Sequence, residues 1–298
     1  RMRVEASLRV HLFPRLGDRP LAALRPTDVQ AVVKGLSDTL APGTVRMTYV
    51  TLRAVFRAAV LDRVIVSSPC MRIALPAADH KTLTIPDAAL VRRITSALPA
   101  HWQAVPLVAA GTGLRPGELF GLQVADVDFL RRTVRVERQL DDQRDLVPLK
   151  TRSSYRTVPL PQVVADELAR HLAVAGRREG LIFAGRDGLP ARLNTFTVAW
   201  RHALAVVDGP KGLRLHDLRH SYASALIQAG ESVKTIQARM GHASAMVTLD
   251  VYGHLWPDSE ERTRAAVDAW LAAPADPVRT AEAYVQVTRY DVEFLEKA

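Results

Sequence analysis

Apolar side chains recur every three or four residues in the first part of the chain, which is the spacing of one face of an α-helix. One such stripe covers residues 29–36. A second consists of Val45, Thr48, Leu52, Val55, Phe56 and Ala59. Residues 13–20 contain two prolines and a glycine and predict a turn between helices. We therefore expect residues 1–78 to form a small helical domain.

Three arginines, Arg46, Arg53 and Arg57, lie on the helix opposite the second apolar stripe. Such a row is either a solvated face or a surface that contacts the phosphate backbone of a nucleic acid. The sequence leaves these two interpretations open.

The pattern changes after the proline-containing residues 67–79, which we interpret as a linker. Helical spacing returns, and residues 133–137, 146–149 and 156–160 then alternate or extend as strands. We expect a mainly α fold with a small antiparallel β-sheet (α+β), whose second domain spans residues 79–275. Residues 276–298 carry five acids against three bases and form a separate tail, for which disorder is one interpretation.

The amino-acid composition limits which classes of binding partner are expected. The 298 residues have 48% hydrophobic side chains, enough for two cores, and 40 Lys plus Arg against 31 acids give a net charge of +9. A basic chain favours a polyanion, and no apolar run is long enough to span a membrane. Cys70, the only cysteine, excludes internal disulfides and a zinc ribbon and fits a reducing cytosol. Because the first residue is not Met, we expect the chain to begin inside a longer gene product.

Residues 213–252 concentrate candidate chemistry. On a helix, His216 and Arg219 would share one face and reach a single anion. Gly241 predicts a helix end, His242 follows it, and Tyr252 supplies a phenol whose proton must be removed before its oxygen can attack. Each residue alone is more often structural than catalytic, so the combination carries the hypothesis.

An upstream segment adds one more cation. Residues 111–119 do not fit a dinucleotide or P-loop fingerprint, because Pro116 stands where the third glycine would fall. Pro116 suits a first helical position, which places Arg115 at the helix N-terminus. A cation is mildly unfavourable there, and this mismatch suggests a ligand.

These motifs together resemble the tyrosine recombinases (phage integrase family): Thr-Gly-Leu-Arg-Pro-Gly-Glu-Leu at 112–119, His-x-x-Arg, Gly-His and Tyr. The resemblance covers nearly all of residues 1–272. It implies a core-binding domain at residues 1–78 that clamps DNA against a catalytic domain at residues 79–275. It also implies seven site residues. These are Arg115, His216, Arg219 and His242 around one phosphate, Glu118 as a supporting carboxylate, Lys150 on a β-hairpin as general acid, and Tyr252 as nucleophile.

The same resemblance implies the reaction and its partners. A site-specific recombinase or integrase of phages and mobile elements would cut and rejoin double-stranded DNA through a 3′-phosphotyrosyl link, with no cofactor and no metal. Four strand exchanges imply a homotetramer on paired duplexes, and a DNA-bending accessory protein is a further candidate partner. We expect a cytoplasmic, nucleoid-associated protein with no membrane partner. Phage-type members often carry an N-terminal arm-binding domain, and none is visible in these residues.

Three alternatives remain. The same residue set resembles type IB topoisomerases, and a non-catalytic DNA-binding protein could retain parts of it. A metalloenzyme could use His216, His220 and His242 as ligands, although Arg219 between them would repel a cation.

Overall fold

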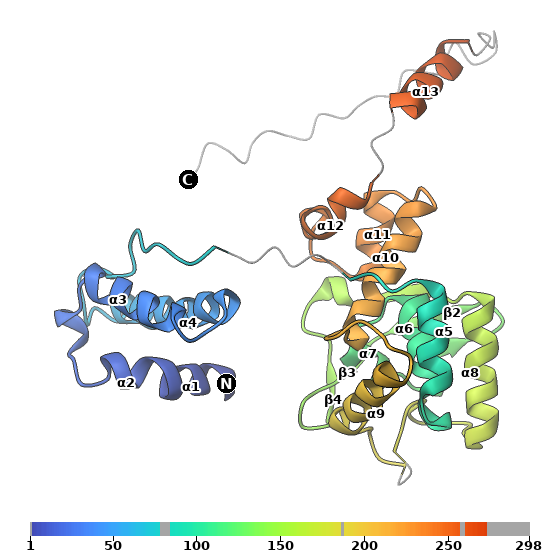
Figure 1. Ribbon diagram of the computed structural model, residues 1–298, viewed down its shortest axis with the longest axis horizontal. Helices are drawn as coiled ribbons and strands as arrows, with labels where there is room; N and C mark the ends of the chain where they lie inside the picture. Colours follow the sequence, from blue (N-terminus) through green and yellow to red (C-terminus); the bar gives the residue numbers. More distant parts are fainter. Residues whose placement is uncertain (1, 78–83, 186–187, 257–259, 273–298) are drawn as a thin grey trace. The chain divides into compact units, whose positions relative to one another are not determined.

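The computed structural model describes residues 2–77, 84–185, 188–256 and 260–272 (Figure 1). The chain divides into two compact units, Arg1–Thr82 and Leu83–Ala298. The predicted domain boundary at residues 78–79 and the predicted tail at residues 276–298 lie outside the described residues. Among the helices that are described, none has the length and apolar character needed to cross a bilayer.

The first unit is built from helices around one apolar core. Leu12, Val29, Val45 and Phe56 are among its buried side chains. Its elements are α1 (Met2–Ser7), η1 (Leu8–Leu12), α2 (Phe13–Leu16), η2 (Leu21–Ala23), α3 (Pro26–Ser37) and α4 (Pro42–Leu61). A turn over all of residues 13–20 was therefore wrong, since Phe13–Leu16 is helical. Pro14 is the second residue of α2 and follows η1, a π-helical stretch that continues from α1 without a break.

Helix α4 buries the predicted apolar stripe, and its three arginines differ in exposure. Val45, Thr48, Leu52, Phe56 and Ala59 are buried, and Val55 is half-buried. Arg53 and Arg57 are exposed. Arg46 is half-buried because its Nε donates to the Pro76 carbonyl at 2.9 Å, so this arginine ties α4 to the segment that leads out of the unit.

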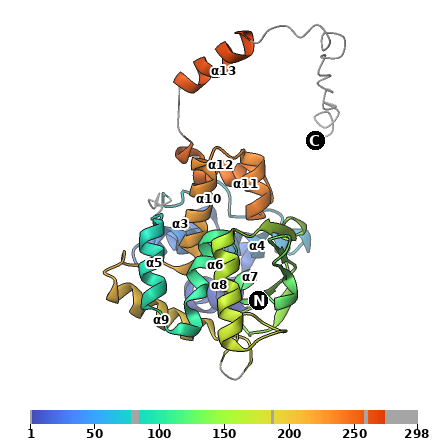
Figure 2. The ribbon, with the colours of Figure 1, turned by 90° about the vertical axis from the view of Figure 1, so that its right-hand side faces the viewer.

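The second unit surrounds α6 (Ala104–Thr112), a helix that is apolar on most sides. It packs against α5 (Ala88–Ala97), α8 (Gln162–Ala175) and α10 (Leu218–Gln228), as Figure 2 shows for α5 and α8. A helix that is buried on several faces needs this composition. The other helices of the unit are η3 (Ala100–Trp102), α7 (Pro116–Phe120), η4 (Val124–Asp126), η5 (Arg152–Ser154), α9 (Leu193–Val206), η6 (Leu215–Asp217), α11 (Val233–Met240), α12 (Ala245–Tyr252), η7 (Gly253–Leu255) and α13 (Glu260–Ala272).

The strands form two small antiparallel sheets. One has the order β1 (Val127–Asp128), β2 (Thr133–Val136) and β5 (Arg156–Pro159), with Val134 opposite Val158. The other pairs β3 (Arg138–Leu140) with β4 (Leu146–Pro148). The mainly α fold with small antiparallel sheets is thus confirmed.

The hairpin expected around Lys150 was wrong in its pairing. The strands that flank Lys150 are β4 and β5, and they belong to different sheets. Strand β4 already has its partner in β3, across the tight turn at residues 141–145. The connection that carries Lys150 leads from one sheet to the other and contains the short helix η5.

Candidate active site

Arg115 stands at the start of α7, directly after the turn that ends α6. Its backbone N–H donates to Oε2 of Glu118 at 2.9 Å, and its Nη1 donates to Oε1 at 2.7 Å. The carboxylate therefore compensates for a cation at a helix N-terminus, where the macrodipole disfavours it. The Arg115 side chain remains 35% exposed, so its outer edge faces solvent.

Arg219 is buried, with 3% of its surface exposed. Its Nη1 donates to the Gly113 carbonyl and its Nη2 to the Met240 carbonyl, so two separate chain segments hold it. Burial lowers the pKa of Arg219 to about 9, and the neighbouring guanidinium groups of Arg115 and Arg156 add to the effect. The group still carries its charge at neutral pH.

The C-terminal end of α11 gathers three arginines. The carbonyls of Arg239, Met240 and Gly241 accept from Arg156, Arg219 and Arg115 in turn. Unpaired carbonyls at a helix C-terminus carry partial negative charge and suit cations.

Gly241 makes this arrangement possible. Its φ of +63° is left-handed, and a Cβ there would lie 3.1 Å from Nη1 of Arg156 and from the Ser153 carbonyl. A larger residue would therefore strain the turn and press on the arginine beside it.

Arg156 was missed from the sequence. Its side chain is only 5% exposed, and it donates to Glu118 twice, from Nη1 at 3.1 Å and from Nη2 at 2.8 Å. Nη1 also reaches the Ser154 carbonyl at 2.9 Å. A signal was present, because strand alternation puts Arg156 on the same face as the buried Val158.

Glu118 is the carboxylate at the centre of this cluster, with 1% exposure. Burial alone would raise its pKa. Hydrogen bonds and charge from Arg156, with a smaller contribution from Arg115, outweigh burial and hold the pKa below its usual value. Glu118 is therefore ionised, and it fixes Arg115 and Arg156 relative to each other.

Tyr252 is the last residue of α12 and is 2% exposed. Its hydroxyl lies 2.8 Å from Nδ1 of His220, and the His242 ring stacks on its ring at 6.5 Å between centroids with 11° between planes. Burial raises the pKa of Tyr252 to about 12, opposed in part by the charge of Arg219. The phenol is thus neutral at neutral pH and needs a proton acceptor to react.

His216 and His242 are half-buried and share their electrostatic surroundings. Burial lowers the pKa of both to about 4, and Arg219 adds to this. Nδ1 of His242 lies 2.9 Å from the hydroxyl of buried Thr248, which fixes the ring. Both imidazoles are therefore neutral at neutral pH, so the four residues expected around the phosphate are two charged arginines and two neutral rings that can form hydrogen bonds. His216 also lies in η6 rather than in the helix of Arg219.

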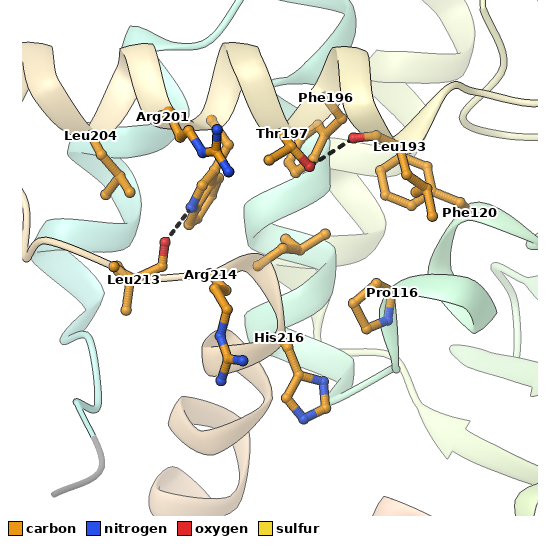
Figure 3. Close-up of a pocket in the computed structure, with 13 residues that line it drawn as sticks. Pro116, Phe120, Leu193, Phe196, Thr197, Arg201, Leu204, Leu213, Arg214 and His216 are labelled. Atoms are coloured by element: carbon orange, nitrogen blue, oxygen red, sulfur yellow. Dashed lines mark hydrogen bonds between the residues drawn. The ribbon is translucent and has the colours of Figure 1, made fainter. Parts of the chain in front are cut away.

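A cavity of about 670 Å³ adjoins this cluster, with an apolar floor that includes Phe120, Phe196 and Trp200. Figure 3 shows His216 and Pro116 near each other at its edge, with Arg214 beside them. The Trp200 indole donates to the Leu213 carbonyl at 2.8 Å and closes one side. His216 thus lines the cavity and lies within electrostatic range of Arg219.

Lys150 is exposed and makes no hydrogen bond or ion pair within the described part of the chain. The structure therefore does not bring this lysine to the other predicted residues. In the same residues, no group of three or more His, Cys, Asp or Glu could hold a metal ion. Nδ1 of His220 instead faces Tyr252, and Nδ1 of His242 faces Thr248.

Comparison with known proteins finds integrases both among family models and among individual relatives. The sequence model of the phage integrase family matches residues 86–258, and that of the phage integrase central domain matches residues 1–74. The chain is 28% identical over 237 residues to the ICEBs1 integrase of Bacillus subtilis, covering 74% of this chain and 64% of that protein. It is 30% identical over 262 residues to a putative prophage phiRv2 integrase of Mycobacterium tuberculosis, covering 81% and 68%.

Solved structures show the same fold. The Tn1549 transposon integrase in complex with a circular intermediate DNA matches with a TM-score of 0.76 and 21% identity, over 90% of this chain and 92% of that one. A lambda integrase dimer bound to a core site matches with a TM-score of 0.65 and 18% identity, over 87% and 89%.

Proposed function

The chain belongs to the phage integrase family of tyrosine recombinases, and from that premise we propose that it is a site-specific DNA recombinase. It would cut and rejoin strands through a covalent 3′-phosphotyrosyl link, in the integration or excision of a phage or mobile element. The observation that carries the proposal is the buried Tyr252 within the electrostatic reach of Arg219, which itself lies within the electrostatic reach of Arg115 and Glu118. The match covers only 64% of the length of the ICEBs1 integrase. The activity of a complete integrase is therefore a proposal for this chain.

Arg115 and Arg219 are the proposed phosphate ligands. A guanidinium has five N–H donors. Each of these two arginines uses two of them on the protein within the described residues, and three remain for phosphate oxygens. Donors that are fixed before the substrate arrives stabilise the charge that builds on the phosphate in the transition state without reorganising. His216 and His242 would add hydrogen bonds from neutral rings.

Tyr252 is the proposed nucleophile, and Lys150 the proposed general acid. The phenol oxygen attacks phosphorus, the bond to the 5′ oxygen breaks, and Lys150 protonates that oxygen. Because one phosphodiester replaces another, religation needs no external energy source. Lys150 is exposed on a connection between two sheets, so it would reach the site only when that connection closes on DNA.

Double-stranded DNA is the proposed partner, and the net charge of +9 supports it. Helical unit 1 would clamp one side of the duplex, with Arg53 and Arg57 against its phosphates. Four strand exchanges require four active sites, so we propose a homotetramer on two duplexes, with a DNA-bending protein as a candidate accessory. Trp270 of α13 is 76% exposed, and assembly would give it a partner surface. The DNA would place the protein in the cytoplasm, at the nucleoid.

Covalent trapping tests this function. Wild type and Tyr252→Phe are expressed in bacterial cells, the lysate is denatured, and protein-linked DNA is captured and its ends sequenced. We expect adducts from the wild type alone and equal DNA binding by both proteins, because the substitution removes only one hydroxyl. The adduct ends would also identify the cleavage site.

The alternatives give different results in the same experiment. A non-catalytic DNA-binding protein yields no adduct from either variant, with binding intact. A topoisomerase-like enzyme yields adducts spread over many sequences and relaxes supercoiled plasmid without joining two sites. Adducts from Tyr252→Phe would contradict the assignment of the nucleophile.

A further inference from the structure

The described structure gives the Tyr252 hydroxyl one hydrogen-bond partner, Nδ1 of His220 at 2.8 Å. His220 is not one of the residues assigned above to the reaction. From this geometry we propose that His220 is the general base that accepts the Tyr252 proton during strand cleavage and returns it during religation. The inference rests on the proposed function and adds a catalytic residue to it.

The position of His220 in α10 explains the contact. It follows Arg219 directly, and successive helical residues differ by about 100° in direction. Arg219 therefore points toward Gly113 and Met240, while the His220 ring faces Tyr252 with 5.6 Å between ring centroids. The His216 ring lies 5.7 Å away at 88° and packs on the side of His220.

Other groups near the phenol are poorly suited to take its proton. His242 meets the face of the Tyr252 ring rather than its hydroxyl, and its Nδ1 already lies against Thr248. His216 makes no hydrogen bond to Tyr252 in the residues that the structure covers. Arg219 is already protonated and has no acceptor.

The proton balance is simple. With the His220 proton on Nε2, the Tyr252 hydroxyl donates to Nδ1. As the tyrosine oxygen bonds to phosphorus, its proton moves to Nδ1 and the ring becomes an imidazolium. The bond from phosphorus to the 5′ oxygen breaks, and that oxygen takes a proton from the Lys150 ammonium group. Religation reverses each transfer, so no other reactant is required.

The charges around His220 act in both directions. Burial lowers the pKa of His220, so the ring is neutral and able to accept a proton at neutral pH. Asp217 raises that pKa and would stabilise the imidazolium, while Arg219 and then Arg214 lower it. The aromatic groups that face the ring are His216, on its side, and Tyr252, and His242 lies within electrostatic range.

The test is single-turnover cleavage of a nicked duplex that carries the site recovered by trapping, with the covalent adduct measured on a denaturing gel. His220→Ala removes the acceptor. His220→Asn keeps an oxygen able to accept a hydrogen bond from the phenol but unable to take its proton. His202→Ala, an exposed histidine of α9, is the matched control.

We expect both His220 variants to lose about 10²-fold or more in cleavage rate while binding DNA normally, and His202→Ala to behave as wild type. Added imidazole should partly restore His220→Ala. In the wild type, the rate should fall only at a pH below the free-histidine value of about 6.5, because burial lowers the pKa of His220 and only the neutral ring accepts a proton.

Near-wild-type cleavage by His220→Asn would overturn the inference, because a hydrogen bond would then suffice and His220 would only orient Tyr252. Near-wild-type cleavage by His220→Ala would overturn it as well. Both results leave the proposed recombinase intact, since the wild type forms adducts. Absence of adducts from the wild type would instead remove the proposed function and this inference together.

Discussion

Two regions of the molecule are rich in arginine and use it in opposite ways. In the second unit, Arg156 and Arg219 are buried, and carbonyls at the end of α11 together with Glu118 hold their donors. On α4 of the first unit, Arg53 and Arg57 are exposed, and no hydrogen bond to them occurs within the described residues. A fixed cation fits one phosphate in one geometry, whereas a solvated cation can follow any duplex backbone.

The difference lies in what surrounds the guanidinium group, because the residue type is the same. Burial without compensation is costly for a charge, so the buried cluster exists only because a carboxylate and several carbonyls satisfy it. The α4 row needs no such support, and in its proposed role it would bind DNA through the release of counterions from the phosphates. We therefore expect the buried cluster to govern catalysis and stability, and the α4 row to govern salt-dependent binding.

Substitution of Lys150 should give the largest effect. Lys150 is also an exception to the division between buried catalytic cations and exposed binding cations, because it is an exposed cation that we assign to catalysis. Lys150→Ala should slow cleavage by about 10² to 10⁴-fold, since the departing 5′ oxygen loses its proton donor. A duplex with sulfur in place of that oxygen should restore the rate, because a thiolate leaves without protonation. The measurement is single-turnover adduct formation on both duplexes. An equal defect on both would contradict the general-acid role.

Arg156→Met tests the buried cluster itself. It leaves the Glu118 carboxylate buried without its principal partner, and we expect a loss of about 3 to 5 kcal/mol in the free energy of unfolding. Urea denaturation measures the change. Arg170→Met is the matched control, because the Arg170–Glu167 pair lies on the surface of α8 and should contribute less than about 1 kcal/mol.

The double variant Arg156→Met/Glu118→Leu separates the two roles of the cluster. It removes both buried charges and should recover much of the stability, while Arg115 loses its carboxylate and cleavage stays slow.

The loss of stability caused by Arg156→Met should become smaller in acid. Because the folded-state pKa of Glu118 is lowered, its stabilisation is present above the unfolded value of about 4.3 and is lost as the pH falls through the folded value. Unchanged stability of Arg156→Met would refute the structural role.

The α4 row should give the smallest effect. Arg53→Ala and Arg57→Ala should each weaken DNA binding a few-fold and reduce the slope of log affinity against log salt by about 0.9 per lost phosphate contact. Cleavage of DNA that is already bound should not change. Lys34→Ala on α3, which removes one exposed charge elsewhere in the unit, is the control. An unchanged salt slope would make Arg53 and Arg57 merely solvated.

Several local features could be predicted because neighbouring residues determine them. Helix α11 ends where Gly241 predicted a helix end, and Gly241 has a positive φ. Pro116 begins α7 and places Arg115 at its N-terminus. These signals depend on turn chemistry and helical spacing, which act over a few residues and so are legible in the chain.

Contacts between segments that are distant in the chain could not be predicted from the sequence. Arg156 and Glu118 are 38 residues apart, and His220 and Tyr252 are 32 apart, so no local pattern pairs them. The strand pairing around Lys150 was misjudged for a related reason. Strands that follow one another in sequence often pair, but β4 pairs with β3 and β5 pairs with β2.

The sequence by itself determined the apolar stripes of α3 and α4, the strand segments that became β2, β4 and β5, and the types of residue available for phosphate chemistry. Only the tertiary structure decided their charge states and partners: His216 and His242 are neutral, Glu118 binds two arginines, and Tyr252 faces His220. The physical reason is that a pKa and a hydrogen bond depend on burial and on atoms a few ångströms away. Folding brings those atoms together from parts of the chain that are far apart in sequence.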